Sequence, residues 1–570
     1  MRSKYLAFGL LVIYALSNIY LEKILFLENS VLKTVFFLIY FLVWISPLLY
    51  LWRKGKITER FSIPVLVLFL CIFYTSILVT SPIPVGRYTP DVAFHGAKVL
   101  YCSYDHFFND PVTSFPSIYP PVYHIIAGSI MRVLGTGNNW YMLNLFHIFT
   151  LVILFLSVYL LANSLFNPRA GLLSVLLLGS IMDMPIESGM FFPTPFLLGL
   201  ALVINSTTLV YLALRGKKWC LYPSGFLTGL AVTIWPAFLP VAFILTIIVF
   251  FILEKASSRF LHLLKFILPF LVLPLIVWIP QYMLLKSHHL LGHHSIGQYK
   301  GIPGLGWFLD FAVRFILLGG FAHSYKWVVA LFGLIYAFLI AFAIMGFRSL
   351  GKQHMLQKRF LKLFFILMLV TLPLLHYVFT YMYSRRFQVL FSMVIVIVAT
   401  FYLLTKLGKY RILGISFMVF AAGFSGIWNF HKVHEYVLEN KQSYEIVKKY
   451  TTGVLEFFES RTAFGDYIFA TARTYREVIF GNIIRFNLVL HREGNYYSLN
   501  PELSRKMLVH YNTILYSDDF SLIKKTLGYY NIRYVLIHKK EPPYYPGLKK
   551  LIENCNTVYR DEWFSILELD

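Results

Sequence analysis

The sequence predicts an α-helical polytopic membrane protein with about 13 spans and a carboxyl-terminal α/β domain outside the membrane. Of its 570 residues, 58% are hydrophobic and only 14% are charged, and the mean hydropathy is +0.66. Soluble enzymes and disordered scaffolds need far more polar surface, and 4 cysteines are too few for a disulfide-stapled secreted module. These three classes of protein are therefore excluded.

The charges divide the chain into two domains. Residues 1–430 hold 32 Lys and Arg but only 10 Asp and Glu, whereas residues 431–570 hold 19 and 17. The first pattern is typical of a multi-pass membrane domain, and the second is typical of a soluble domain. Because the basic excess lies in short loops between apolar segments, it sets orientation in the membrane, and we expect no nucleic-acid partner.

The membrane domain contains apolar segments that are each long enough to cross a bilayer. The expected spans are roughly 5–27, 31–52, 61–80, 140–163, 170–185, 194–214, 219–236, 237–254, 264–285, 327–346, 363–382, 387–405 and 411–429. The connecting loops 53–60, 254–265 and 348–362 are basic and fall on one side, which the positive-inside rule makes cytoplasmic. We therefore expect a multi-pass cell-membrane protein with a cytoplasmic amino terminus and an extracytoplasmic carboxyl-terminal domain.

The carboxyl-terminal domain mixes strand and helix patterns. Segments rich in β-branched and aromatic residues predict strands at 468–472, 533–539, 556–561 and 564–569. The stretch 431–460, which carries Lys and Glu, predicts a helix. Together these patterns indicate an α/β domain.

The first outer loop, residues 81–139, contains two segments that we expect to form helices at the membrane surface. In the first segment, Thr89 suits the N-cap, Pro90 the first helical position and Asp91 the first turn. His95 follows Asp91 by four residues and shares its helix face, so it can orient that carboxylate. A simpler interpretation stays open, in which Asp91 only complements the helix dipole.

The second segment begins with the run from Tyr119 to His124, which reads YPPVYH. Two prolines in the first turn are a helix-start signal, and they place His124 at the beginning of the helix. We expect His124 to face the same aqueous pocket as Asp91 and His95.

This loop resembles the GT-C superfamily of membrane glycosyltransferases, in particular the prokaryotic membrane proteins labelled "6-pyruvoyl-tetrahydropterin synthase related". The resemblance rests on D-x-x-x-H at Asp91 and His95 and on YPPxxH at 119–124, and it covers the membrane domain from about Phe61 onward. It implies that a sugar linked to a polyprenyl phosphate is the donor on the outer face, and that Asp91 is the general base. The loop has no D-x-D pair that would mark a divalent-metal site, so the sequence assigns no certain cofactor, and a divalent metal stays open.

A phosphate leaving group needs a cation more than a proton donor, so one base suffices and the reaction inverts the anomeric carbon. Arg385 and Arg386 lie in an external turn, where guanidinium groups suit a lipid phosphate. We assign them, with Tyr119 and His124, to the donor phosphate. Alternatively, the two arginines only extend to membrane headgroups.

Two further groups of residues are candidates for substrate or metal contacts. His288, His289, His293 and His294 could hold a transition metal or phosphate, but their spacing matches no standard metal motif, so a solvated substrate-binding loop is the alternative. Glu187 either contacts the acceptor or caps a broken helix.

Two other functions remain open. A transporter or lipid flippase also combines many spans with proline breaks, but the sequence shows no paired halves, and its candidate ionisable residues lie on the outer face and not at the membrane midplane. A membrane scaffold would explain the carboxyl-terminal domain and leave the Asp/His loop unused. The acceptor, whether glycan, protein or lipid, does not follow from the sequence, and membrane lipids are expected partners.

Overall fold

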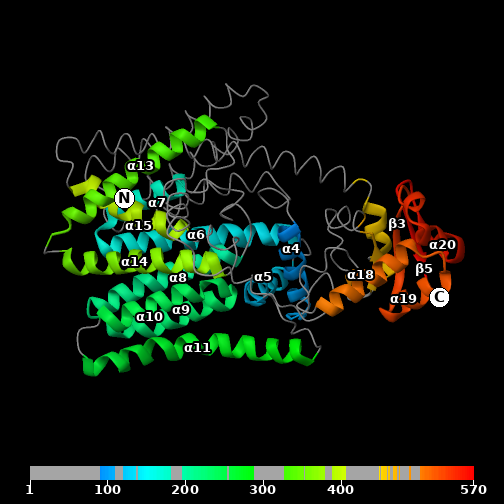
Figure 1. Ribbon diagram of the computed structural model, residues 1–570, viewed down its shortest axis with the longest axis horizontal. Coiled ribbons are helices and arrows are strands. Elements are labelled where there is room, and N and C mark those ends of the chain that lie inside the picture. Colours follow the sequence, from blue (N-terminus) through cyan, green and yellow to red (C-terminus); the bar gives the residue numbers. More distant parts are fainter. Residues whose placement is uncertain are drawn as a thin grey trace, which may run out of the picture. The chain divides into compact units, whose positions relative to one another are not determined.

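The computed structural model describes somewhat more than half of the chain (Figure 1). The described residues are 90–108, 120–135, 139–181, 195–252, 256–287, 326–351, 354–378, 388–405, 449, 451–458, 460–461, 467–471, 474, 487–488 and 501–569. They fall into two compact units, one built mainly from Asn144–Pro274 and the helices of 326–405, and one that contains Tyr88–Leu143 and Leu438–Asp570. The expected spans 5–27, 31–52, 61–80 and 411–429 lie outside the described residues.

Nine long apolar helices of the described residues coincide with the other nine expected spans, and most of their length belongs to the first unit. They are α6 (Asn139–Leu165), α7 (Pro168–Ile181), α8 (Pro195–Leu214), α9 (Leu221–Ile234), α10 (Leu239–Ile252), α11 (Ala256–Ser287), α13 (Lys326–Ser349), α14 (Met355–Val378) and α15 (Gln388–Thr405). The break between α9 and α10 falls at Trp235, whose backbone is extended at φ −151° and ψ 107°. The cause is Pro236, because a proline disfavours helical geometry in the residue before it.

Two basic segments that the sequence predicted as loops are largely helical. Most of 254–265 belongs to α11, which begins at Ala256, and 348–362 contains the end of α13 and the first turns of α14. The prediction was wrong because hydropathy marks the apolar part of a helix and not its end. Lys and Arg are good helix formers, so a helix continues into a basic flank.

Three described helices are long and apolar enough to cross a membrane, namely Leu145–Leu165, Pro195–Leu214 and Arg259–Ser287. Within the protein, 65% and 72% of the first two are buried, against 11% of the third. The exposed side chains of the third are mostly apolar, as on a helix that faces lipid. The total of about 13 spans and their orientation remain predictions.

Hydroxyl groups join α8 to α9. The Ser206 hydroxyl lies 2.7 Å from the Ser224 hydroxyl and 2.6 Å from the Thr228 hydroxyl, and all three residues are fully buried. Small polar residues let two helices approach closely and satisfy each other's hydrogen bonds in an apolar interior. This contact fixes α8 and α9 side by side.

Glycines bring α9 equally close to α11. A Cβ atom on Gly225 would lie 2.0 Å from the carbonyl oxygen of Phe266, and one on Gly229 would lie 2.3 Å from that of Phe270. No side chain fits at such distances. The spacing of four residues between the glycines repeats the contact on the next helical turn.

The carboxyl-terminal domain is built on a five-stranded mixed sheet in the order β2-β1-β3-β5-β4. The strands are β1 (Tyr467–Ala470), β2 (Asn487–Leu488), β3 (Ile532–His538), β4 (Asn556–Arg560) and β5 (Phe564–Glu568). Strands β2, β1 and β3 are parallel, whereas β5 is antiparallel to β3 and β4. The four predicted strands are confirmed, and the predicted α/β class with them.

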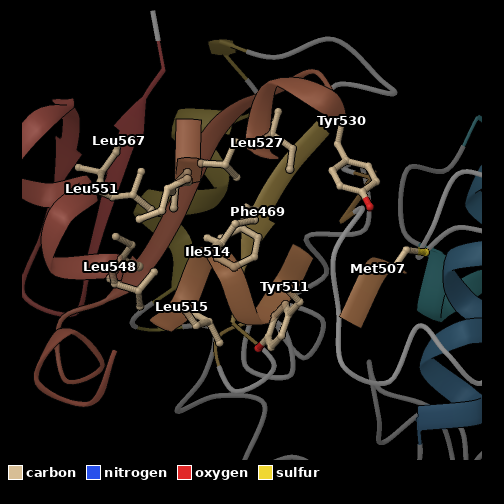
Figure 2. Close-up of a cluster of buried hydrophobic side chains, with 14 residues drawn as sticks. Phe469, Met507, Tyr511, Ile514, Leu515, Leu527, Tyr530, Leu548, Leu551 and Leu567 are labelled. Atoms are coloured by element: carbon tan, nitrogen blue, oxygen red, sulfur yellow. The ribbon is translucent and has the colours of Figure 1, made fainter. Parts of the chain in front are cut away.

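Strand β3 forms the centre of this domain because it is buried on both faces. Val535 and Ile537 face a cluster made with α18 (Pro501–Tyr516), α19 (Phe520–Tyr529) and α20 (Pro546–Asn554), part of which Figure 2 shows. Tyr534 and Leu536 face the opposite cluster, which includes Val454 and Phe458 from the predicted helix at 431–460. The alternation along β3 thus builds a sheet between two helical layers.

Candidate functional site

The two helices predicted in the outer loop exist and pack against each other. They are α4 (Pro90–Ser103) and α5 (Val122–Val133), with 14 and 12 residues. Both are too short to cross a bilayer. The two helices run in the same direction. His95 near the start of α4 contacts His124 near the start of α5, and Asp105 just after α4 pairs with Arg132 near the end of α5.

A glycine allows this pair to pack tightly. A Cβ atom on Gly128 would lie 2.7 Å from the carbonyl oxygen of Val99 and 2.8 Å from the backbone nitrogen of Ser103. The backbone of α4 therefore rests directly on α5 one turn after His124.

His95 and His124 form the centre of the pair. The Nδ1 atom of His95 lies 2.9 Å from the Nε2 atom of His124, and the two rings stack with their centroids 5.1 Å apart. The side chains are 4% and 0% exposed. A hydrogen bond between two imidazoles requires one nitrogen to donate and the other to accept, so the pair shares one proton between its facing nitrogens.

The surroundings of His124 disfavour a charge on this pair. Burial holds the pKa of His124 well below its usual 6.5, and the positive charges of His95 and Lys98 act in the same direction, while a backbone hydrogen bond with Pro120 opposes them. The ring of His124 is therefore neutral at physiological pH.

Lys98 is a functional candidate that the sequence analysis missed. It follows His95 by three residues in α4, and its side chain is completely buried. It also acts on Cys102, one turn further on, whose pKa burial raises to about 12 against the opposing effect of Lys98. The spacing of Asp91, His95 and Lys98 is visible in the sequence. The burial of the Lys98 side chain is not, because it depends on the folded chain.

Asp91 is the second residue of α4, directly after Pro90. The prediction that it lies in the first helical turn, four residues before His95 in the same helix, is confirmed. Its role as a base remains a prediction.

An exposed ion pair closes the other end of the two helices. Arg132 Nη1 donates to both carboxylate oxygens of Asp105, at 2.9 and 3.0 Å. Asp105 has a φ of 67°, which is the left-handed conformation of a turn. Asp105 is thus a turn residue, and a surface ion pair of this kind adds little stability.

The other predicted site residues lie outside the described residues, so their contacts stay predictions. They are Tyr119, Glu187, His288, His289, His293, His294, Arg385 and Arg386. Among the residues that the structure does describe, no group of three His, Cys, Asp or Glu side chains is arranged to hold a metal ion. The use of a divalent metal likewise stays open.

A second buried polar cluster lies in the carboxyl-terminal domain and was not predicted. Glu541, 3% exposed, follows β3, and its carboxylate accepts hydrogen bonds from the hydroxyls of Thr471 and Thr474, which follow β1. The Thr474 distance is 3.0 Å. These bonds tie together the ends of two parallel strands.

No protein-family model matches the chain, and no curated protein sequence matches it either. Solved structures do resemble it. ArnT from Cupriavidus metallidurans bound to undecaprenyl phosphate superposes with a TM-score of 0.56 at 10% identity, over 90% of this chain and 98% of ArnT. The apo state of ArnT gives a TM-score of 0.53 at 10% identity, over 88% of this chain and 97% of ArnT.

The Archaeoglobus fulgidus oligosaccharyltransferase in its apo form gives a TM-score of 0.48 at 13% identity, over 84% of this chain and 70% of the oligosaccharyltransferase. A TM-score below 0.5 does not establish a shared fold. ArnT belongs to the GT-C superfamily that the outer loop resembles. The resemblance is therefore confirmed at the level of the fold.

Proposed function

We propose that the chain is an inverting glycosyltransferase that uses a sugar linked to a polyprenyl phosphate on the outer face of the membrane. The observation that carries this proposal is the buried pair of His95 and His124, which begins one helical turn after Asp91. Surface helices with no chemical task rarely bury two imidazoles and a lysine, because each buried polar group must be compensated.

The fold supports the same chemistry. ArnT, whose fold the chain shares, was solved with undecaprenyl phosphate bound, so this architecture can hold a polyprenyl phosphate. A donor of that class brings its own phosphate leaving group. The protein then has to supply one base for the acceptor and positive charge for the departing phosphate.

In this mechanism, the Asp91 carboxylate accepts the proton of the acceptor hydroxyl as its oxygen attacks the anomeric carbon. His95, whose ring the hydrogen bond to His124 fixes, orients that carboxylate. The bond between the sugar and the lipid phosphate breaks on the opposite face, so the configuration inverts. Arg385 and Arg386, with Tyr119, stabilise the charge on the phosphate. His124, which is buried and neutral, supports His95 instead of contacting the phosphate.

The test is the release of free polyprenyl phosphate and a glycosylated product by the purified protein in liposomes. The liposomes contain polyprenyl-phosphate-linked sugars and an extract of candidate glycans, proteins and lipids. Wild type is expected to turn over, and Asp91→Asn is expected to lose at least about 100-fold in rate, because a positioned general base contributes about that much or more.

Asp105→Asn is the matched control, because it removes a carboxylate from the exposed end of the same helix pair. It should keep the wild-type rate. Full turnover in Asp91→Asn would remove Asp91 from the role of base. Movement of the lipid-linked sugar across the liposome membrane without any glycosylated product would favour the flippase instead.

A further inference from the structure

A cluster of aromatic side chains lies on the surface of the carboxyl-terminal domain, where α19 ends. Tyr529 is 60% exposed, and its ring meets the rings of Tyr530 and His510 edge-to-face, with centroids 4.9 and 5.4 Å away. His510 comes from α18, and its Nδ1 atom lies 2.8 Å from the hydroxyl oxygen of Tyr530. The residue after Tyr530, Asn531, has a φ of 53° and turns the chain into β3. The exposed ring of Tyr529 is therefore held in one orientation before any ligand binds.

A lysine lies at the polar end of this ring. Lys506 of α18 donates a hydrogen bond to the Tyr529 hydroxyl at 3.0 Å, and its Nζ atom lies 4.5 Å from the ring centroid. Because the ammonium group is closer to the hydroxyl than to the ring centre, much of the ring surface stays exposed. Lys525, also exposed, precedes Tyr529 by one helical turn and shares its face of α19. Within the described part of the chain, neither lysine pairs with a carboxylate, so this surface can attract an anion.

Two other exposed tyrosines of this domain have different surroundings. Tyr516 and Tyr544 are 57% and 74% exposed, and among the residues that the structure describes, no cation lies over either ring. Single exposed aromatic side chains are common on protein surfaces and need no explanation. Tyr529 differs from them because its ring has a fixed orientation and an ammonium group and an imidazole at its rim.

These three groups match the chemistry of a sugar. One face of a pyranose ring presents C–H groups that can cover an aromatic ring, while its rim carries hydroxyls that need hydrogen-bond partners. Whether Nδ1 of His510 donates to Tyr530 or accepts from it, the Nε2 atom keeps one hydrogen-bonding role for such a hydroxyl. A negative charge on the sugar would be compensated by the ammonium group of Lys506.

We propose that Tyr529, Lys506 and His510 form a binding site for an anionic sugar, one that carries a carboxylate or a phosphate. The sugar stacks on the Tyr529 ring, donates to or accepts from His510 with a hydroxyl, and places its anionic group beside Lys506. The further assignment of this sugar to a glycan acceptor rests on the proposed function, whereas the binding itself does not.

The first test follows the ring signal of Tyr529 by fluorine NMR, in full-length protein that contains fluorotyrosine and is held in nanodiscs. Tyr529→Phe assigns the signal. The probes are tetragalacturonate, which carries carboxylates, glucose 6-phosphate, which carries a phosphate, and maltotetraose, which is neutral. An anionic probe should shift the signal at about 10 mM, a concentration that detects even millimolar affinity, and the probe that does so identifies the anionic group.

Two results of this test would overturn the proposal. One is the absence of any shift with both anionic probes. The other is broadening of the signal by a paramagnetic lipid without an effect of the sugars, because it would show that this surface lies against the membrane.

The second test measures the affinity for the anionic probe by calorimetry. Tyr529→Ala should weaken binding about fivefold or more, because it removes the stacking surface. Lys506→Met should weaken binding of the anionic probe about two- to fivefold and leave that of maltotetraose unchanged. Both side chains are exposed, so neither change should unfold the domain.

Tyr544→Ala and Lys549→Met are the matched controls, because they remove an exposed tyrosine and an exposed lysine elsewhere in the same domain. Equal losses in these controls, or no loss in Tyr529→Ala, would contradict the site.

Sugar transfer separates this inference from the proposed function. If wild type transfers no sugar but binds the anionic probe through Tyr529, the proposed function fails and the binding site stands. If wild type transfers sugar and neither anionic probe binds, the binding site alone is wrong.

Discussion

The close approach of α4 to Gly128 of α5 yields a sharp prediction. Substitution by alanine would place a methyl group 2.7 Å from the carbonyl oxygen of Val99. The two helices would have to separate by about 0.7 Å to reach an ordinary contact of 3.4 Å. Because His124 lies one turn before Gly128, the same movement would stretch the 2.9 Å bond to His95 to roughly 3.6 Å, which is no longer a hydrogen bond.

We therefore expect Gly128→Ala to destabilise the protein by about 1–3 kcal/mol and to change the ring signals of both histidines. Thermal unfolding in detergent measures the first effect and histidine NMR the second. Gly351→Ala is the control, because it adds the same methyl group where nothing lies within 4 Å. If Gly128→Ala matches wild type in both measurements, the close approach of the helices does not hold the imidazole pair together.

Two further predictions concern other parts of the chain. Gly229→Ala should lower the free energy of unfolding measured in detergent by about 1–3 kcal/mol, because its methyl group would overlap the carbonyl of Phe270. An unchanged free energy of unfolding would contradict the α9–α11 contact. In the carboxyl-terminal domain, hydrogen bonds from the Ser521 hydroxyl and the Leu522 backbone N–H lower the pKa of Asp519 from 3.8. The Asp519 cap should stabilise α19 fully well above pH 3.8, and this stabilisation should disappear as the pH falls through the lower pKa that Asp519 has in the folded protein. Hydrogen exchange of the α19 amides would detect the loss. Asp519→Ala should abolish this pH dependence.

The sequence was sufficient to predict features that depend on local patterns. The start of α4 at Pro90 follows from a proline and an acid in its first turn, and the break at Trp235 follows from Pro236. The β-branched and aromatic residues of 533–539 predicted the strand β3, although not its place at the centre of the sheet. In each case, a short stretch of chain contains the whole physical cause.

Other features depend on residues that meet only in the folded chain. Nothing near Lys98 in the sequence shows that it is buried, and α5, the helix that packs on α4, begins 24 residues further along the chain. Thr471 and Glu541 are 70 residues apart, and their bond depends on the order of the parallel strands. The sequence indicated that His95 and His124 lie near each other only when two motifs were interpreted together, D-x-x-x-H at 91–95 and YPPxxH at 119–124.

Packing and proton chemistry are coupled in the α4–α5 pair. Without Gly128 the helices could not approach closely enough to exclude water from His95, His124 and Lys98. In contact with water, burial would no longer hold the pKa of His124 below its usual 6.5, and this pKa would rise toward that value. A glycine that contacts no substrate thus keeps the imidazole pair buried and uncharged. It follows that Gly128→Ala should raise the pKa of His124, which histidine NMR would measure.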